Sequence, residues 1–578
     1  MSAYSNSIKL VHSFIVIILF VSCSNFIENK KFNRISENFI DQYFKFHPVE
    51  ATLAGNHNYD HQLDNYSKEN INESVRFFKF MIEKIASIDT NKLSNHNKVN
   101  YHILSSQLKL HFFELEHWKR WRRDATFYTQ KIYDAIYGLQ FHTQDTTENV
   151  TRNLIFRLDQ FPKMLIQAKE NLQHADVINL DIAIDHVENQ KRMIAFQLSE
   201  KFVVTKGLID SLHKKSEIVV DSLESFKRFL ESKNHSQTDR SLPMNPEMYK
   251  LYVDLKFTGK VKLEQLIEWI DSDYQKNYDD ILNTAKRYLS KQKNTNEFTI
   301  NPGLNEKIDD EVEKQSLNKD EIIPYCYDNI NDIKRFIDEI WNLSLPINYD
   351  VFIDWAADEQ IFGLKLADFE NPGLLEPTPR FYCLLKPILN DRDWIQQLSQ
   401  LRAYNKPLLK VTMMLEATPS HYQIWFEKLD EIPILARAFP DQSFVSAWHY
   451  YFTFSMINAG FEGYDPELRY VLLKSYARIL LLAKVEIQYY LQQFTNQQAE
   501  QLLLESKMFN KNEIKEVIRQ VNRSVDQFLT IYWGIRQFKK LEEAYRQKSG
   551  PYFNDNEFFQ YILKHGPIPV ELIKRNGS

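Results

Sequence analysis

Glycine is scarce in this chain of 578 residues, which contains only 13. That is about a third of the usual frequency, and tight turns and β-bulges depend on glycine. Hydrophobic residues make up 43 % of the chain and aromatic residues 14 %. The shortage of glycine argues against a turn-rich β-protein. The apolar content predicts a folded, mainly α-helical protein with at most a small β element.

The chain also lacks a basic field. It has 71 Lys and Arg against 77 Asp and Glu, which gives a net charge of −6. No stripe of Lys and Arg interleaved with aromatic residues occurs, although nucleic-acid binding depends on such a surface. We therefore expect no nucleic acid among the partners.

Cysteine is rare as well, and only two of the three cysteines lie in the body of the chain. Cys326 and Cys383 stand in the aromatic segments PYCYD and RFYCLL. They could form a disulfide, but these surroundings favour two buried apolar thiols. Neither cysteine has the spacing of a metal site.

Only one long apolar run is present, FIVIILFV at Phe14–Val21, and Lys9 precedes it. A membrane-spanning helix needs about 20 apolar residues, so this run suits the core of a signal peptide better. Small residues and then Cys23 follow, as in a bacterial lipoprotein cleavage box. An ordinary signal peptide and an uncleaved anchor are the alternatives.

This interpretation divides the N-terminal region into a signal peptide at 1–22 and a tether at 23–35. Cys23 then carries the lipid that anchors the protein to a membrane. Ser24 stands where the inner-membrane retention signal has Asp. We therefore expect a cell-envelope protein at the outer membrane, facing either the periplasm or the cell surface.

The C-terminal half contains the clearest helix signals. Residues 465–467 read Asp-Pro-Glu, which predicts an N-cap, a first-turn proline and a first-turn acid for a helix that extends through Tyr490. Thr495 and Gln498 form a capping box for the next helix. Convincing period-two alternation occurs only in RFYCLL at Arg380–Leu385, where a strand or hairpin is expected.

Several short motifs follow one another along the body. They are PVEATLAGNHNYD, WRRDATFYTQKIY, RLDQFPKMLIQA, MLEATPSHYQ, FVSAWHYY and FFQYILKHGPIPVELI. In this order they resemble the bacterial domain of unknown function 885 family. The resemblance implies a single large, multi-helix, zincin-like domain at 36–575 with an internal cleft. It also implies a zinc-dependent hydrolase that acts on peptides.

The family's metal segment reads His-Glu, about two further residues, and then Pro-Gly-His-His. In this chain Leu415 replaces the first histidine, while Glu416 keeps the position of the general base. His421 remains, but Tyr422 replaces its histidine neighbour. Leucine cannot bind a metal, so this segment retains one imidazole ligand instead of two.

Three further ligand positions of the family are substituted. Ser446 stands where a Glu-Gly-Trp-Ala segment supplies a carboxylate, Tyr490 replaces a histidine, and Phe559 replaces the histidine of a Phe-His pair. A catalytic zinc needs three protein ligands and a water molecule. We therefore expect no metal cofactor and a pseudo-metallopeptidase.

Alternatives remain open at this site. His449 lies one helical turn beyond Ser446, so Glu416, His421 and His449 could form a rearranged zinc site, which would make the chain an active peptide hydrolase. Glu416 could instead be structural, paired with an arginine or solvated.

Three classes of function follow. The first is a non-catalytic lipoprotein that keeps peptide binding in the cleft, and it is our main hypothesis. The second is the rearranged hydrolase. The third is a structural envelope protein whose cleft is filled by the substituted side chains. The sequence does not indicate an oligomeric state.

Overall fold

The structure is a computed structural model. It describes residues 2–576 except 144, 174–176, 199–201, 203–204, 237–243, 258–261, 294–302, 344–350, 357–364, 371, 377–379, 389–393 and 417–431.

Helices dominate the chain, as predicted. The N-terminal elements are α1 (Ser2–Phe46), α2 (Pro48–Leu53), η1 (His57–Tyr59), α3 (Lys68–Ala86), η2 (Thr90–Lys92), α4 (Asn95–Phe113), the π-helical η3 (Glu114–Trp118), α5 (Arg120–Arg123), α6 (Ala125–Phe141), α7 (Thr147–Asn171), α8 (Val177–Arg192), the π-helical η4 (Met193–Gln197) and α10 (Lys206–Ser236).

The remaining elements contain the only strands of the described residues. They are α11 (Pro246–Lys256), α12 (Leu263–Lys293), α13 (Gly303–Glu313), α14 (Lys319–Trp341), β1 (Val351–Trp355), β2 (Ala367–Glu370), β3 (Phe381–Leu385), α15 (Trp394–Ala403), α16 (Lys406–Leu415), α18 (Ile434–Ala438), α19 (Gln442–Asn458), η6 (Phe461–Gly463), α20 (Pro466–Tyr490), α21 (Asn496–Glu505), α22 (Lys511–Arg523), α23 (Gln527–Ser549), η7 (Gly550–Tyr552), α24 (Asp555–Leu563) and α25 (Val570–Asn576).

The three strands form one small sheet in the order β1-β3-β2. β1 pairs in parallel with β3, and β2 pairs antiparallel to β3. The central strand β3 confirms the strand expected at Arg380–Leu385. Cys383 lies in β3 and Cys326 in α14, and both are buried and free, as their surroundings predicted.

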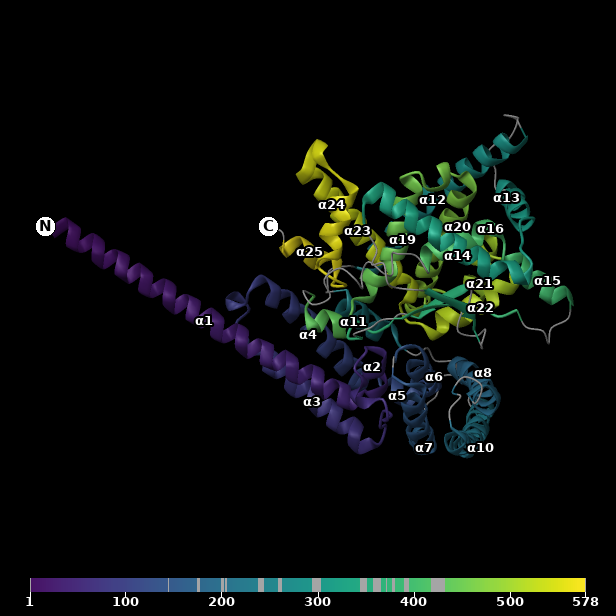
Figure 1. The fold of residues 1–578 in the computed structure, drawn as a ribbon, viewed down its shortest axis with the longest axis horizontal. Coiled ribbons are helices and arrows are strands. Elements are labelled where there is room, and N and C mark those ends of the chain that lie inside the picture. Colours follow the sequence, from purple (N-terminus) through teal and green to yellow (C-terminus); the bar gives the residue numbers. More distant parts are fainter. Residues whose placement is uncertain are drawn as a thin grey trace.

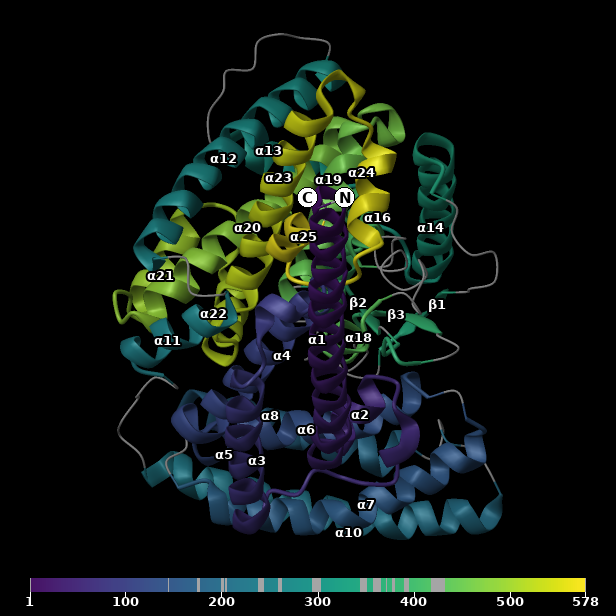
Figure 2. The same ribbon diagram turned by 90° about the vertical axis from the view of Figure 1, so that its left-hand side faces the viewer.

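Two hydrophobic cores organise the molecule. The larger joins α1, α3 and α4 to the sheet and to the helices from α11 onward. The smaller lies mainly among α2, α6, α7, α8 and α10, which we call the helical lobe. Figure 2 shows α7 and α10 of this lobe at the bottom of the view, below the sheet and the C-terminal helices. The junction between the two cores therefore brings α6 and the loop after α2 close to the sheet.

Local signals set the ends of the central helices. Asp465 caps α20 by accepting a hydrogen bond from the backbone N–H of Glu467 (2.8 Å), and α20 ends at Tyr490 as expected. The capping box of Thr495 and Gln498 opens α21. α20 is buried on most of its surface, and α12 and α23 pack against it.

α1 extends away from the body at its N-terminal end (Figure 1). The segment 23–35, which we expect to be a tether, is helical, and Phe32 and Ile35 within it are buried in the larger core. Within the part of the chain that the structure describes, no helix is both long enough and apolar enough to cross a membrane.

Candidate functional site

Glu416 lies at the C-terminal end of α16, where it is the C-cap residue. Asn405 caps the other end of this helix by accepting a hydrogen bond from the backbone N–H of Leu408 (3.0 Å). The hydroxyl of Thr453 on α19 donates to the carbonyl oxygen of Met414 (3.1 Å). The last turn of α16 is thereby fixed against α19, and the backbone position of Glu416 is fixed with it.

The carboxylate of Glu416 pairs with Lys365, a residue just before β2. Lys365 Nζ lies 3.3 Å from Glu416 Oε2 and 3.2 Å from Asp368 Oδ1. Burial raises the pKa of Glu416, and the charge of Lys365 opposes that rise. For Lys365, burial lowers the pKa, but Glu416 and Asp368 outweigh it and raise the pKa overall. The ammonium group therefore stays charged between two carboxylates.

Ser446 and His449 lie one turn apart on α19, and both are partly buried. Burial lowers the pKa of His449 to about 3, and the positive charge of Lys365 contributes to this shift. The imidazole is therefore neutral at physiological pH. Its electrostatic coupling to Lys365 also indicates that His449 belongs to the same region as Glu416.

Three substituted family positions lie in the larger core. Leu415 is buried beside Glu416. Tyr490 is fully buried, stacks on Tyr249 with ring centroids 5.0 Å apart, and donates to the carbonyl oxygen of Asn522 (3.3 Å). Phe559 packs edge-on against Trp341 with centroids 4.8 Å apart. Each of these side chains makes packing contacts, whereas the sequence resemblance predicts a substituted ligand at its position.

Two residues predicted for the metal segment, His421 and Tyr422, lie outside the described residues. Cys23 lies in α1, but its side chain is not described, so lipidation at this residue stays a prediction.

The described residues around Glu416 do not by themselves provide a set of zinc ligands, and His421 lies outside the described residues. A catalytic zinc needs three nitrogen, sulfur or oxygen donors directed at one point. Among the described residues, no group of three His, Cys, Asp or Glu side chains could hold a metal. Leu415 contributes no donor, and the Lys365 ammonium occupies a position beside the Glu416 carboxylate where it repels another cation.

Sequence reasoning missed Lys365 as the partner of Glu416 and considered an arginine or solvent instead. The two residues are 51 positions apart, and the segment around Lys365 contains no motif. Only the three-residue spacing of Lys365 and Asp368 could have indicated an ion pair at the start of a strand.

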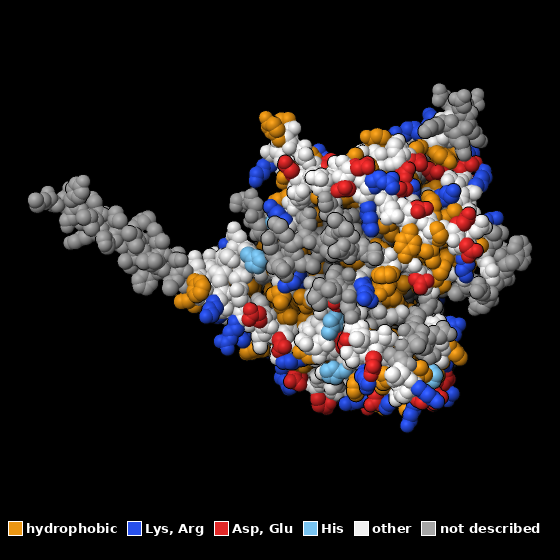
Figure 3. All heavy atoms as spheres, in the orientation of Figure 1, with side chains coloured by type: hydrophobic (Ala, Val, Ile, Leu, Met, Phe, Trp, Pro, Cys, Tyr) orange, Lys and Arg blue, Asp and Glu red, His pale blue; other side chains and the backbone are white. Residues whose placement is uncertain are grey.

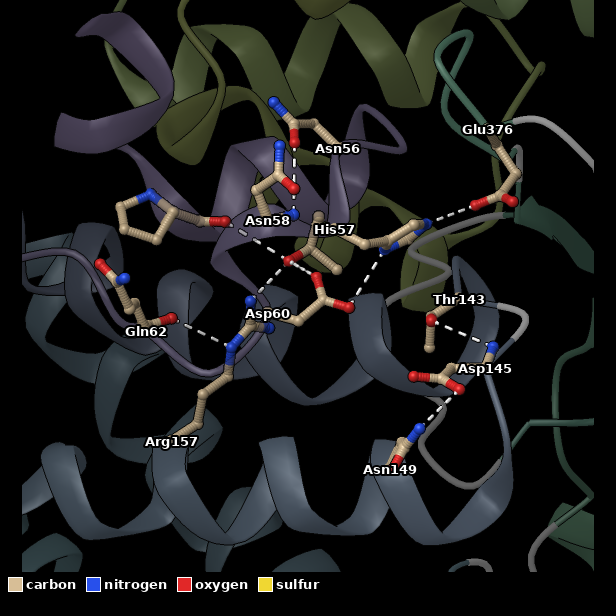
Figure 4. Close-up of polar contacts among 12 residues, drawn as sticks. Asn56, His57, Asn58, Asp60, Gln62, Thr143, Asp145, Asn149, Arg157 and Glu376 are labelled. Carbon is tan, nitrogen blue, oxygen red and sulfur yellow. Dashed lines mark hydrogen bonds and ion pairs between the residues drawn. The ribbon is translucent and has the colours of Figure 1, made fainter. Parts of the chain in front are cut away.

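A second polar cluster joins the helical lobe to the rest of the molecule. His57 in η1 lies between two carboxylates, with Nδ1 3.1 Å from Asp60 Oδ2 and Nε2 2.6 Å from Glu376 Oε2. Figure 4 shows its ring between these two side chains. Burial lowers the pKa of His57, but the hydrogen bonds with Asp60 and Glu376 outweigh it and raise the pKa to about 9.

The same cluster continues into the helical lobe through Arg157, a fully buried residue on α7. Its guanidinium donates to Thr52 Oγ1 (2.6 Å), to the Ala135 carbonyl oxygen (2.6 Å) and to the Gln62 carbonyl oxygen (3.1 Å). The Thr52 hydroxyl in turn donates to Asp60 Oδ1 (2.7 Å). The loop after α2 is therefore held by charged groups on both sides.

Backbone packing makes this junction tight. A side chain at Gly55, where φ is +86°, would place its Cβ 2.3 Å from the backbone nitrogen of Glu376. A Cβ at Gly373 would lie 2.0 Å from the carbonyl carbon of Ala54. Only glycine lets the two loops approach this closely, which brings His57 within reach of Glu376.

Comparisons with known proteins agree with this architecture. A candidate lipoprotein of unknown function from Shewanella oneidensis is similar to this chain with a TM-score of 0.74 and 17 % identity, covering 94 % of this chain and 99 % of that one. A candidate lipoprotein from Colwellia psychrerythraea is similar with a TM-score of 0.77 and 16 % identity, covering 94 % and 98 %. At these identities the likeness concerns the fold alone.

No curated protein matches the chain. The profile of a family described as "Bacterial protein of unknown function (DUF885)" matches residues 48–576. The chain therefore belongs to the DUF885 family.

Proposed function

We propose that this chain is an envelope protein, anchored at the outer membrane by a lipid on Cys23, that binds peptides without hydrolysing them. The main support for the absence of hydrolysis is the ion pair between Lys365 and Glu416, in which Nζ and Oε2 lie 3.3 Å apart. The similarity to candidate lipoproteins of the same fold supports the anchor.

A general base in a zinc peptidase takes a proton from a water molecule that the metal activates. The Lys365 ammonium donates a hydrogen bond to the Glu416 carboxylate and so opposes the rise in its pKa that burial causes. Two unit positive charges about 4 Å apart repel each other by about 4 kcal/mol at an effective dielectric of about 20. Lys365 therefore disfavours a metal ion at this carboxylate.

The junction between the lobes supplies the chemistry for a ligand. Burial raises the pKa of Asp134 on α6 to about 6, and the carboxylates of Glu50 and Glu370 add to this rise although Lys131 opposes it. Glu370 lies on β2, with Oε2 3.5 Å from Nε2 of His142. An ammonium group from a peptide would relieve the repulsion between Asp134 and Glu370. We therefore propose peptides with an amino terminus or a lysine side chain as ligands.

Aromatic rings on α6 fit the same ligand. Tyr133 and Tyr137 stack with centroids 3.9 Å apart. Burial raises the pKa of Tyr133, and the charge of Glu370 adds to this rise. These rings therefore lie near the acidic groups. Aromatic faces attract cations such as ammonium groups.

The test uses the purified lipidated protein in detergent. We expect no stoichiometric zinc by elemental analysis and no chelator-sensitive cleavage of a peptide library. We also expect calorimetric binding of lysine-containing peptides that Asp134→Asn weakens by about tenfold, whereas Asp221→Asn at an exposed position of α10 leaves it unchanged.

The second candidate is the hydrolase with rearranged ligands, which the neutral imidazole of His449 favours because zinc binds the neutral form. One tightly bound zinc per molecule, together with peptide cleavage that His449→Ala removes, would establish that candidate. Peptide binding that is equal in wild type and Asp134→Asn would contradict the proposed binding site.

A further inference from the structure

The part of α1 next to Cys23 presents apolar side chains to the outside. Phe26 is 67 % exposed and Ile27 is 60 % exposed, whereas Phe32 and Phe39 on the same helix are fully buried. A helix turns about 100° per residue, so Phe26 and Ile27 point in directions about 100° apart, and both are exposed because they precede the part of α1 that the body holds. Figure 3 shows hydrophobic side chains where the described side chains of α1 begin.

The connection between α3 and α4, residues 87–94, holds α1 a short distance beyond these residues. The backbone N–H of Asp89 donates to Glu28 Oε1 (3.0 Å), and that of Ser94 donates to Asn29 Oδ1 (3.0 Å). Asn29 Nδ2 also donates to the Lys92 carbonyl oxygen (3.1 Å). α1 is therefore joined to the body from Glu28 onward.

Glu28 lies only five positions after Cys23. Along a helix this corresponds to about 7.5 Å, and α1 is continuous through this segment. A lipid on Cys23 therefore brings the exposed apolar turn and the α3–α4 connection to the bilayer without a flexible tether.

We propose that Phe26 and Ile27 insert into the headgroup region of the lipid leaflet and that the α3–α4 connection lies against the same surface. The partner of this exposed helix face is thus the lipid bilayer. The proposal rests on the lipid anchor of the proposed function. It adds a fixed orientation of the body on the membrane, in which α1 runs from Cys23 at the membrane into the body.

The test places an environment-sensitive fluorophore on single introduced cysteines. Phe26→Cys and Ile27→Cys report on the proposed contact, and the matched control is Phe196→Cys, which replaces another exposed phenylalanine (72 %). Phe196 lies in η4, directly after α8, which Figure 1 shows on the side opposite the free end of α1. Cys326 and Cys383 are buried and should not react.

The lipidated variants are reconstituted into vesicles of phosphatidylethanolamine and phosphatidylglycerol that contain a nitroxide lipid. We expect a blue-shifted emission and at least twofold stronger quenching for labels at positions 26 and 27 than for the label at 196. Equal quenching at all three positions in a lipidated, vesicle-bound protein would overturn this proposal alone.

Two other outcomes would also overturn it. A blue shift at position 26 in detergent that grows with protein concentration would assign the surface to a second copy of the chain. Mass spectrometry that finds no lipid on Cys23 would overturn the anchor and this proposal together.

Discussion

The ion-paired histidine between the two lobes gives the sharpest prediction. The pKa of His57 is about 9 in the folded protein, against about 6.5 for an unperturbed histidine. The folded state therefore holds the proton more tightly than the unfolded state. The resulting stabilisation is fully present below about pH 6.5, decreases as the pH rises, and is lost above about pH 9.

The difference between the two pKa values corresponds to about 3.4 kcal/mol. The His57 side chain is 31 % exposed, so solvent screening reduces this to about 2 kcal/mol. We expect this amount to be lost when the pH is raised from about 6 to about 9.5. His57→Gln should remove most of this pH dependence.

The measurement is hydrogen exchange of the loops that contain His57 and Glu376, corrected for intrinsic rates and followed by mass spectrometry across this pH range. The control is His61→Gln, which alters an exposed histidine of the same loop and should behave as wild type. The reasoning is refuted if wild type and His57→Gln show the same change in opening free energy with pH.

Three further predictions concern buried charges. Arg157→Met should destabilise the protein by about 4 kcal/mol because it leaves buried acceptors on Thr52 and Ala135 without their donor. In urea unfolding the exposed Arg152→Met on the same helix should change stability by less than about 0.5 kcal/mol, and equal effects would contradict this account. Burial raises the pKa of Glu486 well above its ordinary value. Because the folded state therefore binds this proton more tightly than the unfolded state does, Glu486→Gln should gain stability relative to wild type as the pH rises above about 4.5. A gain only below that pH would contradict this reasoning. Finally, for the partly exposed pair of Lys365 and Glu416, Lys365→Met should lower the free energy of unfolding more than the double variant Lys365→Met/Glu416→Gln does. We expect a coupling of about 1 kcal/mol after allowance for the exposure of Lys365. Additive effects in the double-mutant cycle would show that the pair does not contribute.

Local chemistry explains the features that the sequence predicted correctly. The start of α20 at Pro466 follows from the N-cap Asp465, which needs only the adjacent residues. The capping box at Thr495 and the period-two pattern of β3 are similarly local. The burial of Cys326 and Cys383 follows from their apolar neighbours. The mainly α-helical fold was predictable from the composition, because the scarcity of glycine and the high apolar content can be seen without knowing any tertiary contact.

The segment 23–35 shows where this local reasoning reached its limit. Its polar residues are typical of a tether, yet it continues α1 without a break. Phe32 and Ile35 remain helical and buried because the larger core offers them an apolar surface. Such packing depends on elements far along the chain.

The sequence by itself determined the ends of α20, the start of α21, the small sheet's central strand and the family. Only the tertiary structure decided that Lys365 pairs with Glu416 and that His57 pairs with Glu376, 319 residues away. The physical reason is that an ion pair requires two charges to lie within about 4 Å. The packing of distant helices and loops sets that distance, and no local pattern of residues encodes it.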